Sequence, residues 1–395
     1  MKNVALFFIC FCILSCGNDD GLSTPSQGLN PTFAPSPEGG MTRLLEDEFQ
    51  GEPIIIFANV VLRQNDPSDN LDDLPEDQLR WNFVNAYKRE LDGTLLEFKA
   101  VNGDLPIVME DQEGNRWDLF GVAQSGPRQG QQLEWINSGL AFWFAYGTLY
   151  HGTSIYNNPS QSAGAPVAPT EGWDVSTRTI IDAAGLDAIP ALEKPEVIQA
   201  NDPSIPSYMQ EDDIVVGMYI NGEAKAYPHP ILDWHEIVND ELGNKSLTVT
   251  YCPLTGTTKV YERANLTQET FGVSGFLYNS NLMPYDRASR SVWLQLEGRS
   301  VNGARRGEQL GLLSSFEMPW SVWKSIYPNT TVVSTNTGIA RNYGSYPYGD
   351  YRTNNDFIFS PVEFVDERLP TKERVFGIII DGEAKVYRKT DFFNR

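Results

Sequence analysis

The chain of 395 residues carries 52 acidic and 30 basic side chains, which give it a formal net charge of −22. This charge opposes binding to nucleic acid and electrostatic docking onto anionic lipid. The length is ample for two domains, and their stability must come from packed cores, because Cys252 is the only cysteine beyond the first sixteen residues.

The first residues predict an export signal. Lys2 precedes an apolar run, Val4 to Leu14, that is too short to span a membrane. The run ends in Ile-Leu-Ser-Cys, which is similar to the bacterial lipobox. We therefore predict a signal peptide over residues 1–15 and a lipid anchor on Cys16. The anchor would hold the protein in the bacterial cell envelope, at the periplasmic face of the outer membrane or at the cell surface. The alternative is an ordinary secretory signal with a coincidental cysteine.

Two changes of composition divide the rest of the chain. Residues 16–45 are rich in Gly, Ser, Pro and Asn, which predicts a flexible tether, and residues 157–172 have the composition of an interdomain linker. They leave an N-terminal β-rich domain over residues 46–156 and a C-terminal domain over residues 173–395.

Most of the predicted elements are strands. Short runs of β-branched and aromatic residues, bounded by turn residues, predict strands over 52–62, 215–220, 247–252 and 258–263. Helical patterns are few and predict helices over 195–200, 230–240 and 319–327. The fold class is therefore α+β, dominated by antiparallel sheet.

One internal similarity predicts two hairpins. Residues 215–227 (VVGMYINGEAKAY) recur as residues 375–387 (VFGIIIDGEAKVY). Each copy places Asn-Gly or Asp-Gly between alternating apolar residues, which is a strong hairpin signal. The two hairpins share one design and could pair in one sheet.

A looser similarity relates the two halves of the chain. Residues 111–133 resemble residues 286–310, since Asp, Trp, three glycines and Leu follow in the same order. Upstream, residues 54–59 lie where residues 248–253 lie in the later copy. We predict that the N-terminal half is a diverged copy of the C-terminal core and that the chemistry belongs to the second copy. Chance similarity is the alternative.

The lone thiol of Cys252 lies at the end of a predicted strand. Alternation sends Thr248, Thr250 and Cys252 to one face of the strand, and the neighbouring apolar residues to the other. Sites are often built where strands end and loops gather. An unpaired thiol in an exported protein indicates a reactive group or a ligand, whereas a small buried hydrophobe is the alternative.

A histidine lies on the predicted helix just upstream. His235 shares an apolar stripe with Ile231 and Trp234, and Asn239 follows one turn later. His229 lies six residues before His235, a spacing that excludes a zinc-protease helix. A satisfied core histidine is the alternative to a site residue.

Several long motifs resemble one protein family. The segments VVGMYINGEAKAYPHPILDWHEIVNDELG, LTVTYCPLTGTTKVYER and FGVSGFLYNSNLMPYDRASRSVWLQLEG are similar to domain of unknown function 3179, an uncharacterised bacterial and archaeal family, over about residues 180–390. The resemblance implies further candidate pocket residues, which are Glu236, Asp240, Asp286, Arg287 and Trp293. Where the family commonly has a second cysteine this chain has Thr255, which argues against a two-thiol redox centre. The resemblance implies no reaction.

Two kinds of site could use Cys252 and His235. One is a copper or zinc centre formed by Cys252, His235 and His229 and completed by Glu236 or Asp286. The other is a nucleophilic Cys252 with His235 as the base and Asn239 or Glu236 orienting the ring. Both need the thiolate.

The competing hypothesis is a non-catalytic surface module that binds a glycan, a peptide or a partner protein. Four tyrosines of the segment YGSYPYGDY could form a stacking platform. They are Tyr343, Tyr346, Tyr348 and Tyr351. The sequence leaves open whether the protein is an enzyme.

Overall fold

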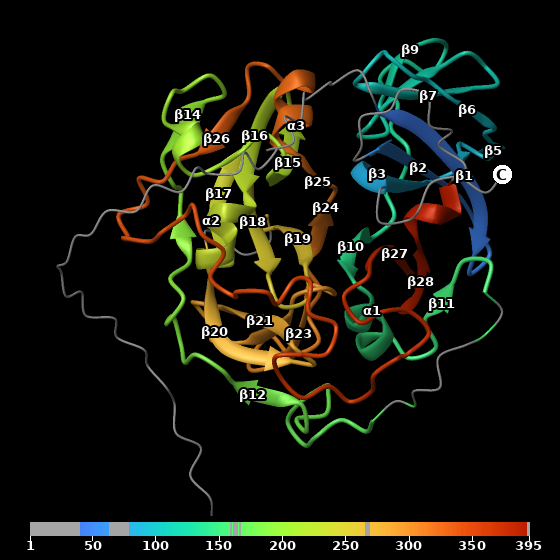
Figure 1. Cartoon of the computed structure of the whole chain (residues 1–395). Helices are drawn as coiled ribbons and strands as arrows, with labels where there is room; N and C mark the ends of the chain where they lie inside the picture. The colour runs from blue at the N-terminus through green and yellow to red at the C-terminus, as the bar shows by residue number, and fades with distance from the viewer. Residues whose placement is uncertain are drawn as a thin grey trace, which may run out of the picture. The chain divides into compact units, whose positions relative to one another are not determined.

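The computed structural model describes residues 40–62, 79–158, 160, 165, 167–264 and 269–392 (Figure 1). The predicted signal peptide, Cys16 and most of the tether lie outside these residues, as does part of the predicted linker. The described residues form twenty-eight strands, most of them paired antiparallel, and three short α-helices. The predicted α+β class is therefore confirmed. None of the described helices has the length and apolar character needed to cross a membrane.

Three small sheets belong to the first half of the chain. Their strands are β1 (Met41–Phe49), β2 (Glu52–Leu62) and β3 (Leu79–Lys88); β4 (Glu90–Leu91) and β5 (Thr94–Leu95); and β6 (Phe98–Ala100), β7 (Ile107–Asp111), β8 (Arg116–Asp118) and β9 (Ala123–Ser125). The central strand β2 is apolar on both faces, because Ile55 and Phe57 pack into one core cluster while Ile54 and Ile56 pack into another. This double burial explains its continuous apolar sequence.

Three five-stranded sheets belong to the second half. The first has the order β13 (Leu192–Glu193), β17 (Ile237–Leu242), β18 (Lys245–Cys252), β19 (Thr257–Glu262) and β24 (Gly311–Leu313). The second has the order β12 (Ile180–Asp182), β20 (Phe271–Tyr278), β21 (Asn281–Asp286), β22 (Val292–Leu294) and β23 (Arg299–Asn302). The third has the order β14 (Val197–Gln199), β26 (Thr331–Val333), β16 (Glu223–Pro228), β15 (Ile214–Ile220) and β25 (Phe316–Pro319). Helix α2 (His229–His235) follows β16, and helix α3 (Trp320–Ile326) follows β25.

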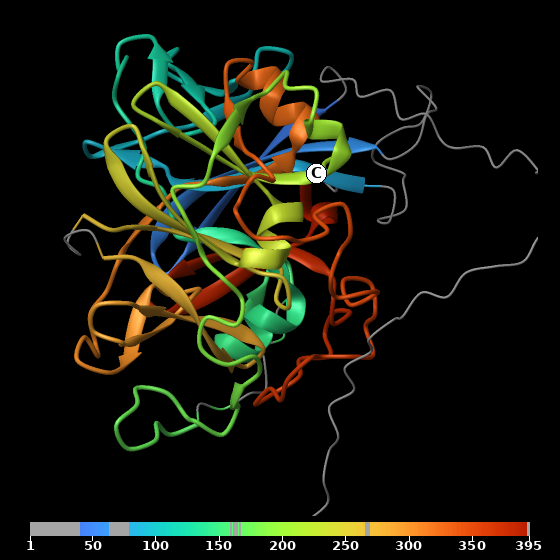
Figure 2. The same ribbon diagram turned by 90° about the vertical axis from the view of Figure 1, so that its left-hand side faces the viewer.

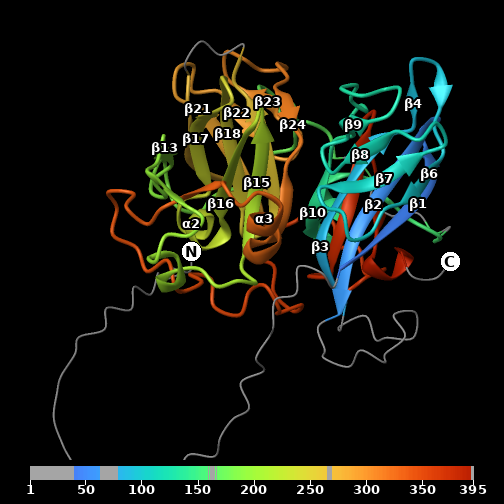
Figure 3. The same ribbon diagram turned by 90° about the horizontal axis from the view of Figure 1, so that it is seen from above.

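The remaining sheet joins the two ends of the chain. Its order is β10 (Ser138–Phe142), β27 (Arg374–Ile380), β28 (Glu383–Tyr387) and β11 (Ser154–Ile155). Helix α1 (Trp143–Leu149) follows β10 and lies beside this red C-terminal hairpin (Figures 1 and 2). Both repeated segments are hairpins, as predicted, but the prediction that they pair in one sheet is wrong, because β15–β16 and β27–β28 lie in different sheets (Figure 3). Strands from before residue 157 (β10 and β11) and from after residue 172 (β27 and β28) share the sheet that joins the two ends of the chain.

The looser repeat is reproduced contact by contact. The indole nitrogen of Trp117 donates to Asp111 at 2.9 Å, and that of Trp293 donates to Asp286 at 3.0 Å. The predicted alignment of residues 54–59 with residues 248–253 is wrong by one residue. When the pairing of β2 with its two neighbours is matched to the pairing of β18 with its two neighbours, Asn59, and not the residue before it, corresponds to Cys252. Successive side chains of a strand point to opposite faces of the sheet. The shift by one residue therefore changes which face of β2 corresponds to the face of β18 that carries Cys252.

A matched triad shows where the C-terminal hairpin belongs. The matched groups are Lys225, Tyr227 and Asp240 in the second half and Lys385, Tyr387 and Asp47 in the first. Asp240 Oδ2 lies 2.8 Å from its lysine Nζ and 3.0 Å from its tyrosine Oη. Asp47 Oδ2 lies 2.5 and 2.8 Å from the same atoms of its own pair. The hairpin that precedes the second repeat is thus supplied to the first repeat by the end of the chain.

Two of the three predicted helices need correction. Residues 195–200 contain strand β14, and the helix predicted over 230–240 ends at His235, after which β17 begins. Glu236 breaks the helix with φ 57° and ψ −31°, and the β-branched residues that follow favour strand. Asn239 is therefore on a strand. The helix predicted over 319–327 is confirmed as α3.

Candidate functional site

The C-terminal end of α2 is held by one long loop. Residues 334–373, as the structure describes them, connect β26 to β27 without a helix or strand. We call residues 343–352 of this segment the tyrosine loop. Loops of this length inside a compact fold usually have a function.

Four consecutive residues, 233–236, lie at the C-terminal end of α2. Each of them forms a hydrogen bond with a different residue of the tyrosine loop. The pairs are Asp233 Oδ2 with Arg352 Nη2 at 2.5 Å, Trp234 Nε1 with the Ser345 carbonyl at 3.2 Å, His235 Nε2 with Tyr343 Oη at 2.7 Å, and Glu236 Oε1 with Tyr348 Oη at 3.2 Å. A chain segment without its own ladder of hydrogen bonds is thereby fixed over the helix.

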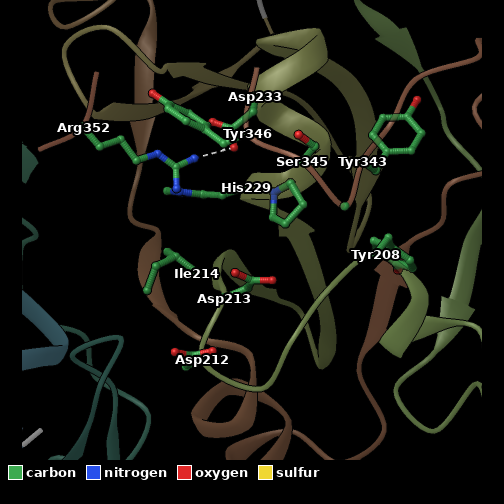
Figure 4. Close-up of a pocket in the computed structure, with 12 residues that line it drawn as sticks. Tyr208, Asp212, Asp213, Ile214, His229, Asp233, Tyr343, Ser345, Tyr346 and Arg352 are labelled. Carbon is green, nitrogen blue, oxygen red and sulfur yellow. Dashed lines mark hydrogen bonds and ion pairs between the residues drawn. The ribbon is translucent and has the colours of Figure 1, made fainter. Parts of the chain in front are cut away.

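A cavity of about 220 Å³ lies between α2, the tyrosine loop and residues 208–214 (Figure 4). Its polar lining comes from Tyr208, Asp212, Asp213, His229, Asp233, Tyr343, Ser345, Tyr346 and Arg352. Arg352 reaches in from the loop and its guanidinium lies 3.6 Å from the centre of the Tyr346 ring. Figure 4 shows Arg352 pointing to Asp233 across this space.

Asp233 is a buried carboxyl of the cavity with only one of its two oxygens paired. Its residue is 4% exposed, and while Oδ2 is paired with Arg352, Oδ1 has no hydrogen-bond partner among the described residues. Burial raises the pKa of Asp233, and Arg352 offsets only part of that rise. Burial also raises the pKa of Asp213. Two carboxyl groups with raised pKa values therefore line one cavity.

His229 connects the cavity to the C-terminal hairpin. Its Nε2 lies 3.1 Å from Glu317 Oε1, and Arg374 on β27 lies 2.8 Å from the same oxygen. Burial alone would raise the pKa of Glu317, but Arg374 and His229 outweigh it, and the pKa is lowered. The ring of His229 thus lies against the Glu317 carboxylate and also lines the cavity.

His235 is a fully partnered histidine. Nδ1 lies 2.7 Å from the Pro190 carbonyl oxygen, which can only accept, so Nδ1 carries the proton and Nε2 accepts from the Tyr343 hydroxyl. Tyr343 is in turn 2.6 Å from the Thr337 hydroxyl. Burial lowers the pKa of His235, which favours the neutral ring. His235 therefore positions Tyr343 and the tyrosine loop.

Cys252 has different partners from His235. Its residue is 1% exposed, and Sγ accepts a hydrogen bond from the Leu282 amide at 3.3 Å and lies 3.7 Å from the Ser280 carbonyl. Burial raises the pKa of Cys252 to about 11, with Glu236 adding to the rise. The neutral thiol is a poor nucleophile and a poor ligand, so these surroundings favour the interpretation of Cys252 as a small buried hydrophobe.

Glu236 combines strain with burial. Its φ of 57° with ψ −31° is a sparsely populated backbone region for a residue with a side chain. Burial raises the pKa of Glu236 to about 7, although the hydrogen bond from Tyr348 opposes the rise. A buried carboxyl that is half protonated near neutral pH links the tyrosine loop to the end of α2.

No metal centre is assembled from the predicted ligands. In the part of the chain that the structure describes, no group of three or more His, Cys, Asp and Glu side chains is arranged to hold a metal ion. Cys252, His235 and His229 each have the separate partners given above. The copper or zinc centre predicted from them therefore gains no support from the geometry.

The comparisons with known proteins identify the family. The sequence model of one family, described as "Protein of unknown function (DUF3179)", matches residues 186–394, which is more than half of the chain. The chain belongs to the DUF3179 family. No curated protein and no solved structure matches it.

The other DUF3179 motif residues stabilise the second repeat. Asn239 Oδ1 accepts from Thr248 Oγ1 at 2.8 Å and from the Phe271 amide at 2.9 Å, so Asn239 ties β17 to its neighbours rather than orienting His235. Asp240 belongs to the matched triad, and Asp286 accepts from Trp293. These contacts recur in the first repeat at Asp47 and Asp111, so they belong to the architecture. The last of the predicted pocket residues, Arg287, forms an ion pair with Glu193.

The four tyrosines do not form an open platform. Tyr343 and Tyr351 are buried, while Tyr346 and Tyr348 are partly buried and packed against each other with ring centres 5.5 Å apart. Only Tyr343 and Tyr346 line the cavity.

The residues that line the cavity were mostly missed by sequence reasoning. Asp213, Tyr208 and Arg352 carry no periodicity or motif that marks a site, and Asp233 lies within a family motif but was not among the predicted site residues. The one available signal was the long irregular segment with its four tyrosines, which indicated a binding function without indicating which helix the segment covers.

Proposed function

We propose that this protein is a lipid-anchored component of the bacterial cell envelope that binds a small hydroxyl-bearing ligand, of the size of one sugar residue, in the cavity under the tyrosine loop. The lipobox-like sequence before Cys16 supports the anchor. The cavity and its polar lining support the binding function.

The observation that carries the proposal is the free oxygen of Asp233. A buried carboxylate oxygen without a partner is costly, by about 1–3 kcal/mol or more. Asp233 lines the cavity, so a ligand hydroxyl that donates to Oδ1 would remove this cost. A hydroxyl is a suitable donor, because it can also accept from the guanidinium of Arg352.

The size and composition of the cavity suit one sugar residue. Drug-sized ligands occupy cavities of roughly 300–1,000 Å³, and this cavity has about 220 Å³. Asp213 adds a second carboxyl, and the tyrosine rings supply the flat apolar surfaces that pack against the C–H faces of a sugar.

Binding is tested by isothermal titration calorimetry on the full chain in detergent, with a panel of monosaccharides. Asp233→Asn should weaken binding by about tenfold, because the ligand hydroxyl then donates to a neutral amide oxygen in place of a charged carboxylate. Asp213→Asn is the second variant, since Asp213 does not hold Arg352 in an ion pair. Asp92→Asn, at an exposed carboxyl of the other repeat, is the control and should bind like the unchanged chain.

The binding proposal fails if no sugar of the panel binds, or if both cavity variants bind as well as the control. The anchor is tested separately by metabolic labelling with radioactive palmitate. The unchanged chain should incorporate label and Cys16→Ser should not; equal labelling of both would exclude lipidation at Cys16.

A further inference from the structure

A larger cavity lies at the tip of the C-terminal hairpin. It has a volume of about 620 Å³ and lies where the β27–β28 turn and the end of α1 meet the β22–β23 turn of the second repeat. It shares no residue with the cavity under the tyrosine loop. The residues that matter in its lining are Tyr150, His151, Glu297, Arg299, Asp381 and Glu383.

The equivalent place at the other hairpin is filled with aromatic rings. At the tip of β15–β16, Tyr219 stacks on Tyr327 with ring centres 4.9 Å apart, and Phe120 packs on Tyr219 at 6.1 Å. The fold therefore does not require a cavity at a hairpin tip.

The internal repeat identifies the residues of the C-terminal hairpin and its surroundings that correspond to Tyr219, Tyr327 and Phe120. Ile379 is 160 residues after Tyr219, the offset of the two hairpins, and Tyr150 follows α1 as Tyr327 follows α3. Glu297 corresponds to Phe120, because the Gln309 side chain donates to the Glu297 carbonyl just as the Gln132 side chain donates to the Phe120 carbonyl.

Two of the three aromatic residues at the tip of β15–β16 thus have non-aromatic counterparts at the tip of β27–β28. Ile379 stands for Tyr219 and Glu297 for Phe120, while Tyr150 keeps its ring. The hydroxyl of Tyr150 has no hydrogen-bond partner among the described residues, although the residue is only 4% exposed. Tyr150 is one of the residues that line the cavity, so its unpartnered hydroxyl points to a ligand that supplies a partner.

The charge of the lining selects the ligand class. Arg299 lies 2.8 Å from Glu297 and 3.8 Å from Asp174, so its charge is already compensated. Asp381 and Glu383 form no ion pair with a Lys or Arg in the described part of the chain. The cavity therefore presents surplus negative charge next to the apolar surface of Ile379 and Leu149.

We propose that this cavity is a second binding site, which takes a small organic amine with an aliphatic stem. The ammonium group would bind the carboxylates of Asp381 and Glu383 and donate to the Tyr150 hydroxyl. The stem would pack on Ile379, where a ring packs in the other repeat.

Isothermal titration calorimetry of the full chain in detergent tests this proposal, with putrescine and spermidine as probes and 1,4-butanediol as the neutral comparison. Both amines should bind and the diol should not. Glu383→Gln should weaken amine binding by at least about threefold. Ile379→Tyr should abolish binding without lowering the melting temperature, because it rebuilds the packing of the other hairpin.

The matched control is Glu223→Gln, which removes the same carboxyl from the other hairpin, 160 residues earlier. It should bind the amines like the unchanged chain. Equal weakening by Glu223→Gln would show that the acidic surface attracts amines without a site and would overturn the proposal. Absence of amine binding at millimolar concentration, or unchanged binding in Ile379→Tyr, would do the same.

Discussion

Replacing Glu236 by glutamine should remove a large part of the pH dependence of stability between about pH 5 and pH 8. Burial raises the pKa of Glu236 in the folded chain to about 7, against an ordinary value of 4.5 that we take for the unfolded chain. Because the folded state binds the proton more tightly, Glu236 favours folding in its neutral form. Its destabilising effect grows as pH rises above 4.5 and is complete above about pH 7.

The magnitude follows from the two pKa values. A difference of about 2.5 pH units is worth about 3.4 kcal/mol at 1.36 kcal/mol per unit. Part of this loss is already present at pH 5, so about 2.5 kcal/mol should be lost between pH 5 and pH 8. Glutamine cannot ionise and keeps an oxygen that can accept from Tyr348.

The assay is urea unfolding of the unchanged chain and Glu236→Gln at several pH values from 5 to 8. The difference in unfolding free energy between the two proteins cancels the other titrating groups, and it should move by about 2.5 kcal/mol in favour of the variant. Glu97→Gln, at an exposed carboxyl, is the control and should show no such trend. A difference that stays constant over this pH range would refute the assignment of a buried, protonated Glu236.

Three further predictions concern packing and reactivity. Gly217→Ala and Gly377→Ala should each lower the free energy of unfolding by about 1–3 kcal/mol, measured with denaturant. The added methyl group would overlap the ring of Trp323 at Gly217 and the ring of Tyr146 at Gly377. An unchanged free energy of unfolding would contradict this packing. Cys252 should not react with a disulfide reagent in the native protein near pH 7.5 and should react at once after unfolding, because its pKa is about 11 and the residue is buried. Tyr343→Phe should raise the rate of proteolysis in the tyrosine loop, since His235 loses its donor; a cleavage rate like that of the unchanged chain would show that this hydrogen bond does not hold the loop.

The two repeats share an architecture but differ in both cavities. The Lys–Tyr–Asp triad and the Trp–Asp hydrogen bond occur twice, which explains them by folding alone. In contrast, the position 160 residues after Asp233 is Phe393, and that after Tyr219 is Ile379. The positions that differ between the repeats therefore include Asp233, on which the first proposal rests, and Ile379, whose packing surface the second proposal uses.

The sequence by itself determined the local features of this protein. Alternation and Asn-Gly or Asp-Gly turns predicted both hairpins, the strand 247–252 and its two faces, and the Trp-rich helix α3. The family motifs placed His235, Glu236 and Cys252 in one region of the second repeat. These features are local because turn chemistry and side-chain periodicity act over a few residues.

Only the tertiary structure decided which segments meet. Nothing local shows that β27 pairs with β10 rather than with β15, because both hairpins have the same pattern and the choice depends on packing against Tyr146 or Trp323. The tyrosine loop has no periodicity, so its contacts with α2 were invisible to pattern analysis. Cys252 and His235 lie close in sequence, but burial and different hydrogen-bond partners set their chemistry, and the protein environment that shifts a pKa forms only when distant segments pack together.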